Sequence, residues 1–288
     1  MVRSFFAVAL TISSLFLTPF VVASEPPIQV LTFNIRYGTA RDEGHTWDLR
    51  REAVVGAIEE LSPDFVGLQE ALDFQNDFIL ENLNSRYTLV GEGRERGRTG
   101  EHASILFDAD KYTLVRADRF WLSDTPDIPG SKTWSDLPRI LTWIEVLNRK
   151  TSQRFLVMNT HFSHVSDEAR SKSAELILNR LQSIDPPEGT IVFLMGDFNC
   201  RPDSMPHATL TESDKGFHDT QQTLGAPEQR TFNGFRDNEP DAGKPIDWIL
   251  YKGPVAPLSY RVLTEKREGV LPSDHYPVLA GFKIKAQP

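Results

Sequence analysis

Six short polar groups stand at the ends of apolar segments, and their side chains are of the kinds that bind metal ions and phosphate. Carboxylate and amide oxygens are the hard ligands that Mg²⁺ or Mn²⁺ prefers. Two of the groups end in a histidine, His161 and His275, which can donate to phosphate oxygens and can titrate near neutral pH. The six groups are Asn34, Gln69-Glu70, Asn159-Thr160-His161, Gly196-Asp197-Phe198-Asn199, Asp247 and Ser273-Asp274-His275.

Apart from Ser273-Asp274-His275, where an acid beside a histidine has little use in packing, each group alone has an ordinary structural explanation. Asn34 could end a strand in a turn, Glu70 could complement the dipole of a following helix, and His161 could be a hydrogen-bonded core histidine. Asp197 and Asn199 lie in a Gly-Asp-x-Asn sequence of turn-like composition. Only the combination predicts metal-assisted chemistry on a phosphate ester, because one cation and two imidazoles together neutralise the charge that develops there.

Other kinds of catalytic site are not indicated. The first apolar segment is followed by Asn34-Ile35-Arg36-Tyr37-Gly38 rather than by a glycine-rich phosphate loop, so a nucleotide-cofactor fold is not predicted. The absence of an HExxH sequence and of a cysteine–histidine cluster argues against zinc. The only cysteine, Cys200, has no evident base partner and cannot form an internal disulfide, and no GxSxG sequence is present.

Alternating strands and helices must position these groups. Short apolar, β-branched or aromatic segments predict strands, several of them buried on both faces. They are Ile28–Ile35, Phe65–Leu68, Ser104–Phe107, Ile140–Leu147, Phe155–Asn159, Ile191–Met195, Asp247–Tyr251 and Pro277–Phe282. Helical spacing predicts helices over Asp48–Leu61, with Asp48 as N-cap, Asp73–Leu83 and Asp167–Gln182. Because strands outnumber helices, we expect an α/β domain with two sheets in layers.

Four long irregular segments connect these elements. Loops of such length in a compact domain are usually functional, so we expect them to form the rim of a site. They are Arg36–Trp47, Gly91–Glu101, Ser123–Pro138 and Arg201–Gly243.

The charge of the chain limits its partners. It has 288 residues, of which 31 are basic and 40 acidic, and its net charge is −9. Proteins that bind duplex nucleic acid non-specifically usually present a basic face, because neutralised phosphates supply most of that affinity. The acidic total therefore argues against a tight duplex binder, and it fits a metal enzyme whose clustered carboxylates need a cation.

The first 23 residues have the features of a secretory signal peptide. Arg3 supplies a positive charge, Phe5 to Val22 is apolar, and Val21-Val22-Ala23 places small residues before a cut at Ser24. We therefore expect residues 24–288 to form the mature protein, secreted or periplasmic. The alternative is an uncleaved membrane anchor, because the apolar stretch is nearly long enough to span a bilayer. Hydroxyl residues and Pro19 weaken that alternative.

In this order, the six groups resemble the endonuclease/exonuclease/phosphatase superfamily, which includes pancreatic-type deoxyribonucleases, deadenylases, inositol polyphosphate 5-phosphatases and neutral sphingomyelinases. The Gly-Asp-Phe-Asn and Ser-Asp-His sequences, with Glu70 upstream, are specific together. The resemblance spans Ile28 to Phe282 and implies one domain over residues 24–288. It implies an α/β four-layer sandwich, with two mixed β-sheets packed face to face and flanked by helices. Residues 120–143 resemble a bacterial branch similar to the deadenylase group.

The resemblance also implies a metal site, and the residue pattern separately suggests one substrate contact. Glu70 would bind Mg²⁺ or Mn²⁺ directly, with Asn34 and Asp274 contributing to the ligand shell, partly through water. Arg139 follows Pro138 and could clamp a substrate phosphate, although a structural arginine would serve as well there.

The resemblance also implies catalytic roles for five residues. Asp197 would orient or deprotonate the attacking water, and Asn199 would hold a phosphate oxygen. His275 would contact the scissile phosphate, aligned by Asp247, which fixes its tautomer. His161 would donate to a non-bridging oxygen and help to stabilise the transition state.

Two further features have competing explanations. Trp121 and Trp134 could stack a base or sugar, or they could pack in the core or at the rim. The basic run Arg94-Glu95-Arg96-Gly97-Arg98 is expected to be a solvated loop, although it would supply positive charge if it bound substrate.

These features together predict a divalent-metal-dependent phosphodiesterase, nuclease or phosphatase. The phosphorylated substrate could be a nucleic acid, a nucleotide, an inositol or sugar phosphate, or a phospholipid head group, and no obligate protein partner is indicated. A catalytically silent binding protein on this fold is the alternative, but it would be expected to have lost Glu70, Asp197 or His275. A glycoside hydrolase with two carboxylates would not need the amides and histidines.

Overall fold

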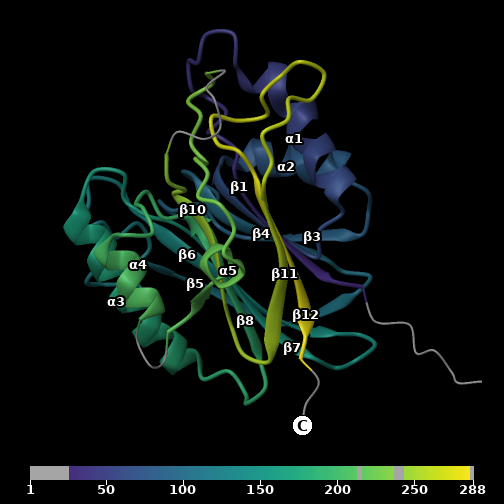
Figure 1. Ribbon diagram of the computed structural model, residues 1–288. Coiled ribbons are helices and arrows are strands. Elements are labelled where there is room, and N and C mark those ends of the chain that lie inside the picture. Colours follow the sequence, from purple (N-terminus) through teal and green to yellow (C-terminus); the bar gives the residue numbers. More distant parts are fainter. Residues whose placement is uncertain (1–25, 213–215, 237–242, 286–288) are drawn as a thin grey trace, which may run out of the picture.

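The computed structural model describes residues 26–212, 216–236 and 243–285, and within these ranges a pair of six-stranded β-sheets pack face to face (Figure 1). The first sheet contains, in spatial order, β11 (Val255–Val262), β12 (Val278–Ile284), β1 (Ile28–Asn34), β2 (Phe65–Ala71), β4 (His102–Asp108) and β3 (Tyr87–Val90). The second contains β5 (Tyr112–Trp121), β6 (Ile140–Asn148), β7 (Arg154–His161), β8 (Ile191–Asp197), β10 (Asp247–Lys252) and β9 (His218–Asp219). Both sheets are mixed, because β1 pairs with β2 and β7 with β8 in parallel.

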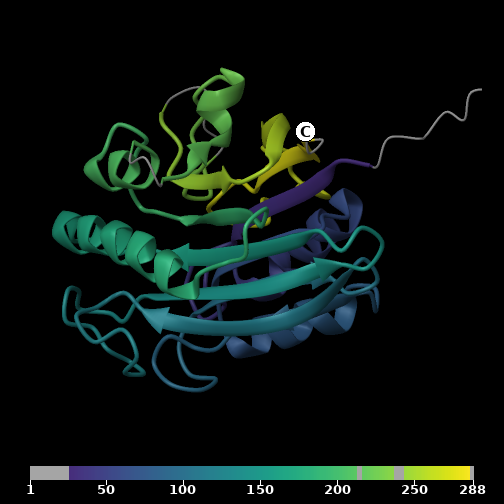
Figure 2. The same cartoon turned by 90° about the horizontal axis from the view of Figure 1, so that it is seen from below.

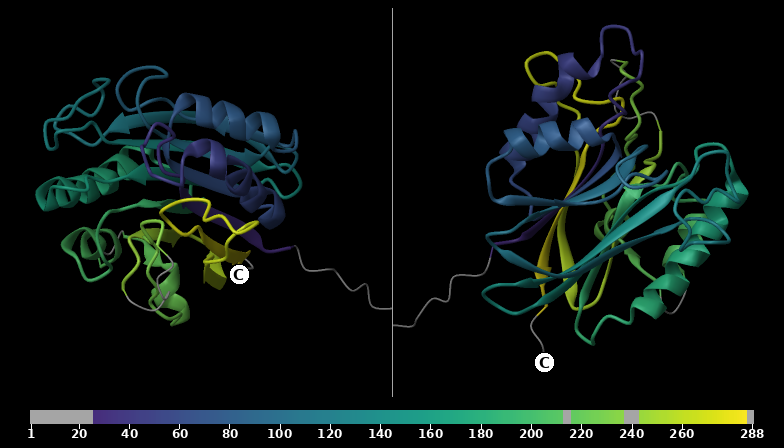
Figure 3. Two further views of the ribbon diagram at one scale, coloured as in Figure 1. Left: turned by 90° about the horizontal axis from the view of Figure 1, so that it is seen from above. Right: turned by 180° about the vertical axis from the view of Figure 1, so that it is seen from behind.

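Helices cover the outer faces of both sheets and complete four layers (Figures 2 and 3). Helices α1 (Trp47–Leu61) and α2 (Asp73–Asn82) pack on the first sheet. Helices α3 (Asp167–Ile184) and α4 (Met205–Thr211) pack on the second, and the short α5 (Thr220–Leu224) follows β9. The predicted four-layer sandwich is confirmed. Within the described ranges, no helix is long and apolar enough to span a bilayer, and the predicted signal peptide lies outside those ranges.

The central core lies between the two sheets and is rich in aromatic side chains. Phe65 of the first sheet packs against Phe155 and Phe193 of the second. On β1, Val30 faces this core, whereas the next residue, Leu31, packs on the helical side of the sheet. The central strands are apolar throughout because both of their faces are buried.

A buried polar contact joins the sheets beneath one of their edges. Gln69 donates to the Asn159 side-chain oxygen at 2.6 Å, and Asn159 donates to the main-chain oxygens of Leu68 and Ser104. A Cβ atom on Gly67 would lie 2.7 Å from the Asn159 oxygen, so only glycine permits this close approach. The two sheets are therefore held at a defined spacing close to the polar strand ends.

The eight predicted strands are present as β1, β2, β4, β6, β7, β8, β10 and β12. Several extend further than expected, so that His161 and Asp197 are the last residues of β7 and β8 rather than residues that follow them. Strands β3, β5, β9 and β11 were not predicted: β3 and β9 are only four and two residues long, and much of β5 and β11 is exposed. The prediction of Asp48 as N-cap is wrong, because Thr46 is the N-cap. Asp48 lies in the first turn, where its negative charge interacts favourably with the positive end of the helix dipole.

Candidate active site

The pairing of the strands brings the six polar groups to one edge of the sandwich. In the first sheet, parallel β1 and β2 both end there, and antiparallel β12 begins there, shortly after Asp274 and His275. In the second sheet, Asp197 is in register with His161 on one side and with Asp247 on the other. Residues up to 241 positions apart in the chain therefore become neighbours, since 275 − 34 = 241.

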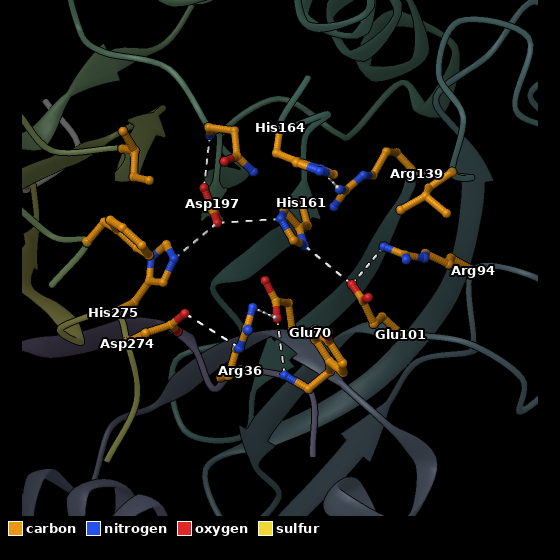
Figure 4. A pocket seen from close by; sticks show the side chains of 15 residues that line it. Arg36, Glu70, Arg94, Glu101, Arg139, His161, His164, Asp197, Asp274 and His275 are labelled. Carbon is orange, nitrogen blue, oxygen red and sulfur yellow. Dashed lines mark hydrogen bonds and ion pairs between the residues drawn. The ribbon is translucent and has the colours of Figure 1, made fainter. Parts of the chain in front are cut away.

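These groups surround a cavity of about 610 Å³ (Figure 4). Of the nine site residues that we predicted, seven line this cavity: Glu70, Arg139, His161, Asp197, Asn199, Asp274 and His275. The other two, Asn34 and Asp247, lie directly behind it and are hydrogen-bonded to residues that line it.

Asn34 connects the two halves of the site. Its side-chain nitrogen donates to Glu70 Oε1 at 3.2 Å and to Asp197 Oδ2 at 3.0 Å, and its oxygen accepts from the backbone N–H of Arg36. The residue is fully buried. A single amide therefore joins a carboxylate of the first sheet to one of the second, and it positions Glu70 from behind.

A bulge turns Glu70 toward the cavity. The register between β2 and β4 shifts between Leu68 and Ala71, and Glu70 has a φ of 60°. Without the bulge, strand alternation would direct Glu70 to the same face as Leu68, which packs on the helical side. Arg36 and Asn199 also have positive φ values, 57° and 49°. Such backbone conformations cost free energy in residues other than glycine and are concentrated at functional sites.

Glu70 and Asp274 form an acidic part of the cavity wall. The guanidinium of Arg36 lies 3.9 Å from Glu70 and 3.6 Å from Asp274, while it forms a closer pair with Asp42 at 2.9 Å. Burial raises the pKa of Asp274, and the neighbouring charge of Glu70 raises it further, against the opposing effect of His275. Two carboxylates in the same part of the wall, with the Asn34 amide behind Glu70, supply oxygen ligands of the kind that fit Mg²⁺ or Mn²⁺.

His275 lies between two carboxylates. Its Nδ1 is 2.9 Å from Asp247 Oδ2, and its Nε2 is 3.7 Å from Asp197 Oδ2. Burial alone would lower the pKa of His275, but the charges of Asp247 and Asp197 outweigh this effect and raise it to about 10. Burial and the charge of Asp247 raise the pKa of Asp197 to about 7, although His275 opposes the shift. This pair therefore combines a protonated imidazole with a carboxyl group that titrates near neutral pH.

The acidic side chains around His275 could also be considered as metal ligands. Ligand atoms of Asp197, Asp247 and His275 all lie within 4.8 Å of one another. However, Nδ1 of His275 is occupied by its hydrogen bond with Asp247, and Asp247 is buried behind the cavity. Glu70 and Asp274, which face the cavity, fit a hydrated cation better.

His161 lies between Asp197 and Glu101 in Figure 4, and unlike His275 it is neutral. Its Nε2 lies 3.4 Å from Asp197 Oδ2, and its Nδ1 lies 3.8 Å from Glu101. Burial lowers the pKa of His161 well below its usual value, and the charges of Arg139 and Arg94 lower it further. The site thus offers one neutral and one charged imidazole to a bound phosphate.

Several lining residues were not predicted from the sequence. Glu101 pairs with Arg94 at 2.7 Å, and both lie in the cavity wall. The expectation of a solvated basic loop is wrong for Arg94, which is buried, whereas Arg96 and Arg98 are exposed as expected. Nothing in the residue pattern distinguishes Arg94 from the other arginines of its run, since only tertiary contacts bury it.

The two tryptophans that could have stacked a substrate do not line the cavity. Trp121 is buried against Ala103 and Ile140, and Trp134 packs partly buried on the outer core of the second sheet. The structure therefore favours packing over substrate stacking as the role of both tryptophans. Phe232, which the sequence did not single out, does line the cavity and contacts the His275 ring edge-on at 5.1 Å.

Comparison with known proteins agrees with this geometry. Residues 31–275 match the model of the Endonuclease/Exonuclease/phosphatase family. A solved endonuclease/exonuclease/phosphatase from Bacteroides vulgatus is 31% identical, with a TM-score of 0.84 over 91% of this chain and 100% of that chain. A mannosyl-6-phosphatase from Bacteroides thetaiotaomicron is 30% identical, with a TM-score of 0.82 over 89% of this chain and 100% of that chain.

A curated relative comes from yeast. The probable RNA exonuclease NGL3 of Saccharomyces cerevisiae is 26% identical over 178 residues. The match covers 58% of this chain and 34% of that protein, so the chain spans only about a third of the yeast protein's length. Similarity to both a nuclease and a phosphatase supports hydrolysis of phosphate esters, but these relatives point to different esters as the substrate.

Proposed function

The chain belongs to the endonuclease/exonuclease/phosphatase family, and we propose that it hydrolyses phosphate esters with Mg²⁺ or Mn²⁺ and an activated water. The observation that carries this proposal is the convergence of six distant polar groups on one cavity. The names of the relatives, an RNA exonuclease and a mannosyl-6-phosphatase, support both nucleic acids and sugar phosphates as candidate substrates. Nucleotides, inositol phosphates and phospholipid head groups fit the same chemistry.

The acidic wall would hold the cation. Glu70 and Asp274 supply carboxylate oxygens, and Asn34 fixes Glu70 by a hydrogen bond at 3.2 Å. When bound there, the cation would offset the negative charge of the phosphoryl oxygens.

Asp197 would accept the proton of the attacking water. Its carboxylate is held by Asn34 on one oxygen and by the backbone N–H of Asn199 on the other. Because its pKa is raised to about 7, Asp197 is a stronger base than an ordinary carboxylate and is still largely ionised just above neutral pH. Asn199 lines the cavity beside it, where its amide can hold a phosphate oxygen.

The two histidines would stabilise the charge that develops on the phosphate. His275 remains protonated and is aligned by Asp247, so it can donate a charged hydrogen bond from Nε2. His161 is neutral, and its Nε2 points toward the same region as that of His275. Donors fixed in advance around a phosphate cost no reorganisation during the reaction, which is why they contribute strongly to rate.

A hydrolysis assay tests this proposal against the alternatives. We expect the protein to hydrolyse bis-p-nitrophenyl phosphate or p-nitrophenyl phosphate, with activity lost in EDTA and regained with Mg²⁺ or Mn²⁺. Asp197→Asn and His275→Ala should each lower the rate by on the order of 10²–10³, while Glu43→Gln, at an exposed loop position, should not. Wild-type activity in either site variant, or activity only on a nitrophenyl glycoside, would contradict the proposal. A folded protein that turns over no phosphate ester would favour the silent binding protein.

A further inference from the structure

One side of the cavity is formed by basic side chains that the scheme above does not use. Arg94 belongs to the loop between β3 and β4, Arg139 directly precedes β6, and His164 follows β7. We call these three residues the arginine wall. Figure 4 shows it on the opposite side of the cavity from Asp274 and His275.

Arg139 is a buried cation without a carboxylate partner among the described residues. It is 5% exposed, and the one side-chain hydrogen bond that it makes within the described residues joins Nη2 to Nδ1 of His164 at 2.9 Å. Its Nε and Nη1 atoms are buried and have no hydrogen-bond partner in the described part of the chain. Burying an unpaired charge is costly, so such an arrangement is expected where a ligand supplies the missing anion.

The other charges of the wall do not neutralise Arg139. Among the carboxylates, Glu101 has the largest charge effect on the pKa of Arg139, but it already forms a 2.7 Å ion pair with Arg94. Two guanidinium groups therefore face one carboxylate. This local positive excess contrasts with the net charge of −9 of the whole chain, so it is a property of this wall and not of the molecule.

His164 adds a directed hydrogen-bond donor. Its pKa is lowered by partial burial and by the charge of Arg139, so the imidazole is neutral. Because Nδ1 faces an arginine, which can only donate, Nδ1 must accept and the proton must lie on Nε2. His164 lines the cavity and can therefore donate to the same anion as Arg139.

The anion at this wall would be distinct from the phosphate that is hydrolysed. The Nε2 atoms of His161 and His275 both approach Asp197, at 3.4 and 3.7 Å, and they mark the position of the reacting phosphate. His161 separates this position from Glu101 and Arg94 in Figure 4. A volume of about 610 Å³ is of the size that holds a whole small molecule, so it has room for more than one phosphate.

We propose that the arginine wall binds a second phosphate group of the same substrate molecule, next to the phosphate that is hydrolysed. The proposal rests on the proposed function and narrows its substrate class to esters with two neighbouring phosphates. Arginine suits this role because its planar guanidinium binds phosphate oxygens in pairs. The second phosphate could belong to a sugar bisphosphate or to the next nucleotide of a short oligonucleotide, which share this chemistry.

The test compares substrates that differ only by the second phosphate. One pair is glucose 6-phosphate and glucose 1,6-bisphosphate, and the other is TpT and 5′-phosphorylated TpT, each with Mg²⁺ or Mn²⁺ present. We expect wild-type kcat/KM to be higher for the two-phosphate member of at least one pair, by roughly 10-fold or more, as a charge-assisted hydrogen bond allows. The pair that shows this preference identifies the source of the second phosphate.

Variants of the wall decide what Arg139 recognises. Arg139→Met should lower kcat/KM for the two-phosphate member roughly 10-fold more than for its partner, and His164→Ala, at an exposed position, should reduce the same preference without affecting folding. Arg96→Met, at an exposed position of the Arg94 loop, is the matched control and should keep the wild-type preference. An equal loss on both members in Arg139→Met, or no wild-type preference in either pair, would overturn this inference alone. No hydrolysis of any member by protein that is active on a nitrophenyl phosphate would also overturn this inference alone, whereas inactivity on the nitrophenyl phosphates as well would contradict the proposed function and this inference with it.

Discussion

His275 is held by two carboxylates, of which only Asp197 lines the cavity. Asp247 is 1% exposed and does not line the cavity, yet its oxygen lies 2.9 Å from Nδ1 of His275. Such a partner fixes the tautomer and orientation of an imidazole and favours its charged form. At the residue scale, the chemistry therefore depends on groups behind the cavity as well as on those in it.

Replacing Asp247 by Asn tests that dependence. We expect kcat to fall by roughly 10- to 100-fold, because His275 loses the charge that helps to raise its pKa to about 10. The loss of activity at alkaline pH should also begin at a lower pH, since a less stabilised imidazolium deprotonates earlier. Steady-state rates across a pH series measure both effects. The double variant with His275→Ala should be no slower than His275→Ala alone, and an additive loss would show that Asp247 acts elsewhere.

At the same scale, the sequence predicted residues whose type and place at a strand end were informative. Glu70, Asp197 and His275 could be identified in this way. Glu101 and Arg94 could not, because they lie in loops and become members of the site only through tertiary contacts. The bulge that turns Glu70 toward the cavity was equally invisible, since it is a property of strand pairing and not of residue type.

At the scale of elements, helix α1 holds the loops of the first sheet through Arg50. This side chain is 1% exposed and donates to main-chain oxygens of two loops, those of Ile35, Arg36 and His45 in one and that of Pro272 in the other. Ile35 and Arg36 follow Asn34, and Pro272 precedes the Ser-Asp-His group. One buried guanidinium therefore links two loops that must keep a fixed separation.

Arg50→Met should release these loops. We expect the free energy of unfolding to fall by at least roughly 1–3 kcal/mol, because buried carbonyl acceptors lose their donor. Urea denaturation measures this change. Arg51→Met is the matched control, since the neighbouring Arg51 side chain is 40% exposed, forms surface ion pairs and lies over the Phe78 ring, and it should cost less than roughly 1 kcal/mol. Equal losses in the two variants would show that Arg50 is not a structural link.

Central and peripheral elements differed in how well the sequence predicted them. The buried strands could be predicted because burial on both faces requires continuous apolar runs, as in β8. Strand β5 could not, because its middle is exposed at the edge of the second sheet and contains Arg116 and Arg119. Its pairing with β6 depends on main-chain hydrogen bonds that leave no pattern in the side chains.

At the scale of the whole molecule, the order of the six groups along the chain indicated the site. The pairing of the strands places each of these groups at the same edge of the sandwich. Apolar segments alone predicted two layered sheets, but the number of strands and their pairing followed only from the resemblance and the structure. The whole chain is acidic, yet the arginine wall inside the cavity is basic. The net charge of a chain therefore does not describe the charge of its site.

Export of the protein remains a proposal at this scale. We propose that residues 1–23 are removed as a signal peptide and that the protein acts outside the cytoplasm. Protein recovered from the periplasm or medium of an expressing bacterium should begin at Ser24 when its N-terminus is sequenced. Recovery of the full-length chain in the membrane fraction would instead support the uncleaved anchor.

We propose above all that Glu70 and Asp274, brought together from distant regions of the chain, hold a cation on which hydrolysis depends. The decisive experiment records the initial rate of phosphate ester hydrolysis as Mg²⁺ is returned to EDTA-treated protein. Wild type and Glu43→Gln should regain activity at the same Mg²⁺ concentration, whereas Glu70→Gln should need roughly 10- to 100-fold more. If EDTA-treated wild type keeps its full rate, or if Glu70→Gln recovers together with wild type, the metal site has been wrongly assigned.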